Sequence, residues 1–81
     1  MSFIVYILFS ETLQKYYVGQ TSDLERRIHD HNAGKANFTS RGIPWILAHY
    51  FQCVDRSEAV RLEGSIKKRG IKRYLQDKGI L

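Results

Sequence analysis

The stretch from residue 16 to residue 32, YYVGQTSDLERRIHDHN, constrains the fold more than any other part of the chain. Its first residues are aromatic or β-branched and favour a strand, which the backbone can leave at Gly19 without a Cβ clash. Ser22 with Glu25 three residues later matches a capping box, which predicts a helix from about residue 23 to about residue 32. The stretch therefore predicts a strand that passes through a tight exit directly into a helix.

This predicted helix has one face that is not simply apolar. Leu24, Ile28 and His31 lie at positions i, i+4 and i+7 and share that face. Arg27 follows Leu24 by three residues and precedes His31 by four, so it borders the same face. Burial explains a leucine and an isoleucine there, but it does not explain an arginine. We therefore expect Tyr17, Arg27 and His31 to point toward whatever the helix packs against.

Length and composition limit the chain to one small unit. With 81 residues we expect a single domain over residues 1–81, and a chain of this size buries only about 60% of its unfolded surface. The single cysteine, Cys53, excludes an intramolecular disulfide, favours a reducing compartment and is expected to be a small core residue. No apolar run approaches about 20 residues and no secretory signal pattern begins the sequence, so we expect a cytoplasmic protein without a membrane partner.

The charge balance suits a phosphate-rich partner. Thirteen Lys and Arg residues against eight Asp and Glu residues give a net charge of +5. The last third of the chain holds a basic cluster, made of Lys67, Lys68, Arg69, Lys72, Arg73 and Lys78. A basic surface that only keeps the protein soluble explains the same charge equally well, so charge alone leaves both interpretations open.

The first half of the chain predicts two paired strands, a helix and a loop. The unbroken apolar run from Phe3 to Phe9 predicts a central strand that is covered on both faces, with Tyr6 as its only polar tip. A short polar connection follows, which predicts that residues 15–20 pair antiparallel with that strand. Beyond the helix, residues 35–43 predict a polar loop or a short helix.

The second half predicts a third strand and two helices. Residues 45–51 alternate, which places the odd-numbered side chains on one face and the even-numbered ones on the other. Asp55 and Glu58 form a second capping box, which predicts a helix from about residue 56 to Gly70, followed by a short helix over residues 71–78. The order β-β-α-(loop)-β-α-α predicts an α/β (α+β) fold in which helices flank a three-stranded antiparallel sheet.

Glu63 is the residue of the second helix that burial explains least. It follows Ala59 by four residues and precedes Ile66 by three, so it lies in the middle of the core-facing stripe. A carboxylate there is unfavourable unless a cation or hydrogen-bond donors meet it. Two tyrosines, an arginine and a carboxylate are groups that phosphodiester cleavage uses to activate water, hold phosphoryl charge and hold a metal. Tyrosine pairs in small sheets are more often packing residues, so spacing alone does not decide.

The same residues resemble the signatures of the GIY-YIG nuclease superfamily. Ile4-Val5-Tyr6 followed by Tyr17-Val18-Gly19 is similar to its two triplets, although only the tyrosine of the first triplet is kept. The resemblance continues through residues 23–32, the loop, Pro44-Trp45 and the helix around Glu63, so it covers essentially the whole chain. The chain is most similar to the small stand-alone bacterial members, and it resembles the catalytic domain of excision-repair and homing endonucleases.

This resemblance implies an activity and a site. It implies a DNA endonuclease that hydrolyses phosphodiester bonds with Mg²⁺ or Mn²⁺, acting on branched, damaged or non-standard DNA in repair or recombination. The family's catalytic residues correspond to Tyr6, Tyr17, Arg27, His31 and Glu63. Glu63 corresponds to the metal ligand, and Gly19 to the glycine that clears space beside the site. Candidate nucleic-acid contacts are Lys35, Thr39, Arg41, Lys67, Lys68 and Lys72.

The sequence departs from the family pattern in two ways. An asparagine that several members carry late in the domain has no counterpart after Glu63, and the sequence shows no added DNA-binding or repair segment. We therefore expect a protein partner or a homodimer to supply specificity. Two alternatives from other classes remain: a non-catalytic DNA- or RNA-binding module that keeps the fold, and an interaction domain that uses its basic helix on a protein partner.

Overall fold

The computed structural model describes residues 2–81 and confirms the predicted fold. Three strands form one antiparallel sheet in the order β2-β1-β3. In chain order the elements are β1 (Phe3–Ser10), β2 (Lys15–Thr21), α1 (Leu24–Asn32), the 3₁₀ helix η1 (Ser40–Gly42), β3 (Trp45–Cys53), α2 (Arg56–Arg69) and α3 (Ile71–Asp77). Within the described residues, none of the helices is long and apolar enough to cross a membrane.

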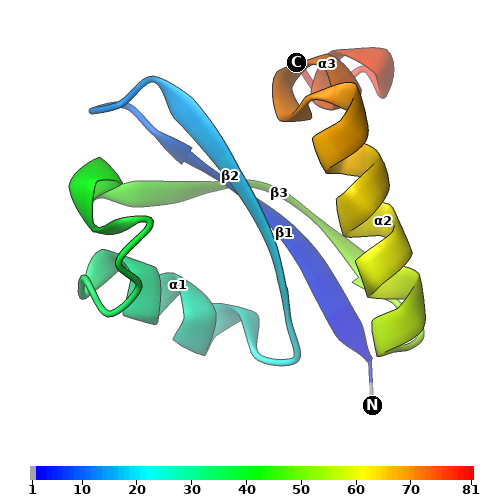
Figure 1. Ribbon diagram of the computed structural model, residues 1–81, viewed down its shortest axis with the longest axis horizontal. Coiled ribbons are helices and arrows are strands. Elements are labelled where there is room, and N and C mark those ends of the chain that lie inside the picture. Colours follow the sequence, from blue (N-terminus) through cyan, green and yellow to red (C-terminus); the bar gives the residue numbers. More distant parts are fainter. Residues whose placement is uncertain (1) are drawn as a thin grey trace.

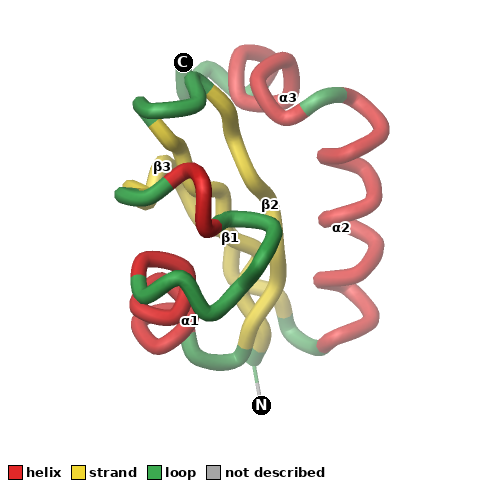
Figure 2. Tube along the Cα trace, turned by 60° about the vertical axis from the view of Figure 1, so that its left-hand side comes forward, coloured by secondary structure: helices red, strands yellow, loops and turns green. Residues whose placement is uncertain are grey.

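The sheet lies between two helical layers (Figure 1). Figure 2 shows α1 and the loop that follows it on one side of the sheet, and α2 with α3 on the other. Val5 and Ile7 of β1 pack on the α2 side, whereas Tyr6 and Leu8 pack on the α1 side. All four side chains are buried, which confirms that β1 is a central strand covered on both faces.

The start of α1 differs from the predicted capping box. The helix begins at Leu24, and its N-cap is Asp23, whose carboxylate accepts a hydrogen bond from the Arg26 N–H at 3.2 Å. The prediction that Ser22 and Glu25 form the box is therefore wrong. Aspartate is as favourable as serine at the N-cap position. Asp23 also directly precedes Leu24, the first residue of the apolar face that the helix buries.

The other helix ends follow the sequence closely. The Asp55 carboxylate accepts a hydrogen bond from the Glu58 N–H at 2.9 Å, which confirms the second cap. Gly34 and Gly70 follow α1 and α2 with φ angles of 76° and 95°, a region in which a side chain is disfavoured.

A β-bulge interrupts β3. Ile7 and Leu8 are neighbours on β1, but their partners on β3 are His49 and Leu47, so Ala48 is left over between them. The extra residue changes which face of β3 is turned toward each helical layer.

The two halves of β3 consequently belong to different layers. Trp45 and Leu47 pack on the α1 side, whereas Phe51 and Cys53 pack on the α2 side. The prediction that the odd-numbered residues of this strand share one face is therefore wrong, because the bulge turns the strand over. Cys53 is 3% exposed, as expected of a core residue.

Candidate active site

A chain of buried hydrogen bonds joins the sheet to α1 and its loop. Tyr6 Oη lies 2.9 Å from His31 Nε2, and His31 Nδ1 lies 2.7 Å from Thr39 Oγ1. Thr39 Oγ1 also donates to the carbonyl oxygen of Ala36 at 3.3 Å. A hydroxyl has one proton, so the threonine accepts from His31 Nδ1, and His31 Nε2 accepts from the Tyr6 hydroxyl. The direction of every bond in the chain is thereby fixed.

Burial keeps both titratable members of this chain uncharged. It lowers the pKa of His31, and the positive charge of Arg27 lowers it further, while Asp30 acts in the opposite direction. Burial also raises the pKa of the Tyr6 phenol, an effect that Arg27 partly offsets. A tyrosine needs a lowered pKa to serve as a general base, so this role does not suit Tyr6.

Gly19 provides the space that the Tyr6 ring occupies. The two residues are partners across β1 and β2. A Cβ atom on Gly19 would lie 2.5 Å from Tyr6 Oη and 2.7 Å from its Cζ, closer than real Cβ contacts come. The rigid, buried Tyr6 ring comes so close to the backbone at position 19 that only glycine, which has no Cβ atom, fits there.

Side chains from β2 and α1 surround Tyr6. The Tyr17 ring, on β2, lies 6.4 Å from the Tyr6 ring and 5.2 Å from the His31 ring, measured between centroids. Burial raises the pKa of Tyr6 most, Arg27 of α1 lowers it, and Glu63 of α2 raises it most weakly. The structure thus brings Tyr6, Tyr17, Arg27 and His31 together beside β2, which runs between α1 and α2 (Figure 1). Glu63 is connected to them through Lys67, which lines a pocket with Tyr17.

Glu63 lies at the edge of this cluster and already has a cationic partner. Its side chain is 17% exposed, and its Oε2 lies 2.8 Å from Lys67 Nζ. The hydrogen bond to Glu63 raises the pKa of Lys67. The lysine side chain is 60% exposed, so solvent screens the pair and it contributes little to stability.

The carboxylate of Glu63 can hold only part of a metal's coordination shell. No group of three or more His, Cys, Asp and Glu side chains within residues 2–81 is arranged to hold a metal ion. Mg²⁺ nevertheless needs only one or two carboxylates where waters and phosphate oxygens complete its shell. Since the Lys67 ammonium group reaches Glu63, the carboxylate is accessible to a cation, and the residues fit such an ion.

Comparison with known proteins agrees with this geometry. The sequence model of the GIY-YIG catalytic domain matches residues 2–75. The chain belongs to the GIY-YIG family. This family comprises nucleases, which generally use divalent metal ions.

The similar proteins carry the name UPF0213. The solution NMR structure of the UPF0213 protein BH0048 from Bacillus halodurans matches with a TM-score of 0.61 and 31% identity, over 99% of this GIY-YIG chain and 85% of that one. A UPF0213 protein of Haloquadratum walsbyi is 38% identical over 69 residues, which is 82% of this chain and 78% of the relative. A UPF0213 protein of Serratia proteamaculans is 43% identical over 53 residues, 64% of this chain and 52% of the relative.

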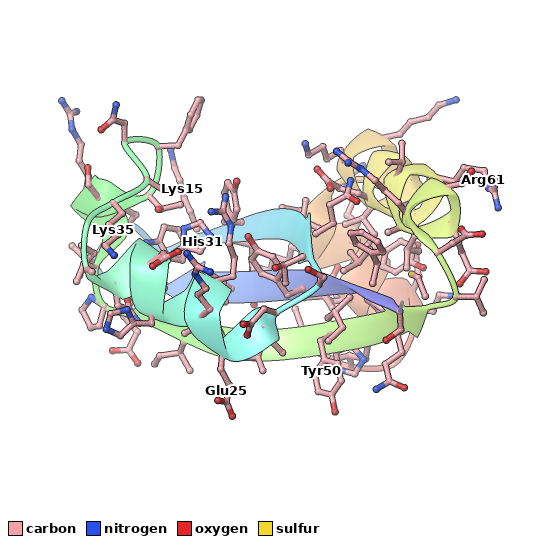
Figure 3. The ribbon with its side chains drawn as sticks, turned by 90° about the horizontal axis from the view of Figure 1, so that it is seen from below. Lys15, Glu25, His31, Lys35, Tyr50 and Arg61 are labelled. Carbon is pink, nitrogen blue, oxygen red and sulfur yellow. The ribbon has the colours of Figure 1, made fainter. Side chains whose placement is uncertain are left out.

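The predicted nucleic-acid contacts of the GIY-YIG domain fall into two groups. Thr39 is 1% exposed and its hydroxyl is engaged by His31, so the prediction that it contacts nucleic acid is wrong. The exposed side chains are those of Lys35, Arg41, Lys67, Lys68 and Lys72. Lys35 Nζ lies 3.6 Å from an Asp30 carboxylate oxygen. Figure 3 shows Lys35 and Lys15 at the end of the molecule that carries α1, and Arg61 on the far side of α2.

Asn32 and Trp45, to which the sequence analysis gave no site role, hold the loop of the GIY-YIG domain in place. Asn32 Oδ1 accepts from the Trp45 N–H at 2.7 Å, and Asn32 Nδ2 donates to the Trp45 carbonyl at 3.1 Å. The Trp45 indole N–H donates to the Thr39 carbonyl at 2.7 Å. Asn32 thus pairs with the first residue of β3 as a neighbouring strand would. The available signal was an asparagine at the end of the predicted helix, within the stretch that resembles the family.

Proposed function

We propose that this GIY-YIG domain is a divalent-metal-dependent endonuclease that hydrolyses DNA phosphodiester bonds. We propose further that it uses Mg²⁺ or Mn²⁺ and acts on branched, damaged or non-standard DNA in repair or recombination. The observation that carries the proposal is that Tyr6 and Tyr17 pack together beside His31, while Lys67, the partner of Glu63, lines a pocket with Tyr17. The net charge of +5 supports a polyanionic substrate.

Each of these residues has a separate role in the proposal. Tyr17 is partly exposed and orients the attacking water, whereas Tyr6 stays protonated and is held by His31. Arg27 stabilises the negative charge that develops on the phosphoryl oxygens. Glu63 holds the divalent ion, which when bound would neutralise phosphoryl charge and lower the pKa of a coordinated water. Lys67 leaves the Glu63 carboxylate and pairs with a DNA phosphate.

The substitution Glu63→Gln tests this assignment, because it keeps the shape of the side chain and removes its charge. We expect Mg²⁺-dependent nicking of branched DNA to fall by about 10²-fold or more, the scale of losing one electrostatic contact to the transition state. DNA binding should persist, and the melting temperature should change little because the pair with Lys67 is screened. Glu25→Gln is the matched control, since this exposed side chain points away from the sheet (Figure 3).

Two results would overturn parts of the proposal. A Glu63→Gln protein that nicks at the wild-type rate would exclude Glu63 as the metal ligand. A folded wild-type protein that binds branched DNA but does not nick it with Mg²⁺ or Mn²⁺ would exclude the nuclease.

A second candidate function is a non-catalytic nucleic-acid-binding module. The contact between Glu63 and Lys67 favours it, because the carboxylate already carries a cation where a metal would bind. The nicking assay with the wild-type protein distinguishes this module from the nuclease.

A further inference from the structure

Three adjoining pockets follow the outer edge of β2. Their volumes are about 450, 310 and 330 Å³, each pair of them shares lining residues, and Tyr16 lines all three. We call the three pockets together the β2 groove. The lining residues that matter below are Lys15, Tyr16, Tyr17, Phe38, Lys67 and Lys72.

The β2 groove is lined by three lysines, of which Lys67 pairs with Glu63. Lys15, Lys67 and Lys72 line it, and the described residues that bound the three pockets include no Asp or Glu. All three lysines are exposed. Such a row of cations attracts the phosphates of a nucleic-acid backbone, which releases counterions when it binds. Because Lys67 and Tyr17 line the same pocket, the groove leads into the candidate active site.

One wall of the groove carries an aromatic ring that has no packing role. Phe38 is 93% exposed, although most phenylalanine side chains are buried. Its backbone is nevertheless anchored, because the next residue, Thr39, is bonded through its side chain to His31 and through its carbonyl to Trp45. A ring held out from an anchored segment loses little freedom when a partner covers it.

Aromatic rings beside a line of cations are how proteins bind single-stranded nucleic acid. The cations follow the phosphates, and the rings stack on bases that no partner strand covers. Paired bases already stack on one another, so a duplex leaves no free base face for the ring.

We propose that Phe38 stacks on an unpaired base of a DNA strand that lies in the β2 groove. Lys15 and Lys72 contact phosphates of that strand, and Lys67 contacts the phosphate nearest Tyr17. The assignment rests on the proposed nuclease function and narrows its substrate to DNA with unpaired bases beside the cleaved bond, such as a flap, a bubble or a single-stranded end.

Binding measured in EDTA tests the ring without any cleavage. The probes are a labelled thymidine oligonucleotide of about 15 nucleotides, within the range that one such groove covers, and a duplex of equal length. We expect Phe38→Ala to weaken binding to the single strand by about 5- to 150-fold, the loss of one stacked base, and to leave duplex binding unchanged. Phe38→Leu should weaken binding to the single strand as much as Phe38→Ala does, whereas Phe38→Tyr should bind it as the wild type does.

An oligonucleotide with abasic sites separates stacking from charge, since it keeps the phosphates and lacks the bases. We expect the wild type and Phe38→Ala to bind it equally. An equal loss on the abasic strand, an equal loss on the duplex, or no loss on the single strand would each overturn the inference. The equal loss on the duplex would show that the ring wedges between paired bases instead.

The outcome is independent of the nuclease assay. Binding that depends on Phe38 in a protein that does not nick DNA would support the stacking ring and overturn the proposed function. DNA nicking by a protein whose binding does not depend on Phe38 would support the proposed function and overturn the stacking ring. A melting temperature that matches the wild type confirms that each variant is folded, as a 93% exposed side chain leads us to expect.

Discussion

The two helical layers are attached to the same sheet by different chemistry. On the α2 side the buried contacts are apolar, with Val5 and Ile7 of the sheet against Ala59 and Ile66 of α2. On the α1 side a tyrosine, a histidine and a threonine are buried together and joined by hydrogen bonds. Apolar contacts have no preferred direction, whereas hydrogen bonds fix the position of each group.

The two layers therefore have different roles in the domain. The α2 layer supplies most of the burial that stabilises the domain, and it places Glu63 and Lys67 at its rim. The α1 layer sets the orientation of the Tyr6 hydroxyl and leaves Arg27 beside it. Substitutions in the two layers should therefore separate the stability of the domain from the geometry of the site.

The largest effect on stability is expected in the apolar layer. Ile66 is fully buried between α2 and the sheet, so Ile66→Ala removes apolar contacts and leaves a cavity. We expect the free energy of unfolding to fall by about 2–5 kcal/mol, measured by urea denaturation. Val60→Ala on the same helix is the control, because that side chain is 51% exposed. A loss below about 1 kcal/mol would contradict the role assigned to this layer.

A smaller loss is expected from Gly19→Ala on the other side. The added methyl group collides with the buried Tyr6 ring, so we expect a loss of about 1–3 kcal/mol in the free energy of unfolding. The nicking rate of the folded variant should also fall, because the Tyr6 ring must move away from His31. Gly64→Ala is a matched control, since its Cβ meets nothing within 4 Å and alanine favours helix by about 0.5–1 kcal/mol. An unchanged nicking rate in folded Gly19→Ala would show that the Tyr6 position is not needed.

The buried histidine should make the α1 layer sensitive to acid. Burial and Arg27 lower the pKa of His31 in the folded protein, so below pH of about 6.5 the unfolded chain binds the proton more readily. Stability is complete above this pH and falls as the pH decreases toward the folded pKa, by at most about 1.4 kcal/mol per pH unit. We expect His31→Gln to remove this slope in unfolding experiments, with His29→Gln as the control. A slope that survives in His31→Gln would assign it to other groups.

The smallest effect concerns the groove where the two layers meet at β2. Lys67→Ala and Lys72→Ala should each reduce the salt dependence of DNA binding by about one unit, the effect of one lost phosphate contact. Lys68→Ala serves as the control, because this exposed lysine lines none of the three pockets of the groove. Equal slopes for all three variants would mean that the basic cluster acts as a whole and not through the groove.

The sequence predicted what depends on local pattern. The elements, the second cap and the inward face of α1 follow from spacing, and the family resemblance added the residues that gather around Tyr6. The partner of Glu63 could also have been predicted, because Lys67 follows it by four residues on the same helix. The burial of Thr39 instead depends on how distant elements pack, which spacing does not report. The sequence pattern also gave no sign of the bulge in β3. Buried and exposed residues alternate without interruption from Trp45 to Cys53, even though the buried side chains pack against α1 at one end of the strand and against α2 at the other.

The bulge in β3 has a consequence for how the length of the chain can vary. Leu47 and His49 already face opposite layers, so deleting Ala48 would join them as ordinary neighbours and leave every buried side chain in its own layer. Deleting Ile46 or Gln52 would instead carry Trp45 or Cys53 across the sheet. Homologous chains that are one residue shorter in this strand should therefore have their alignment gap at Ala48.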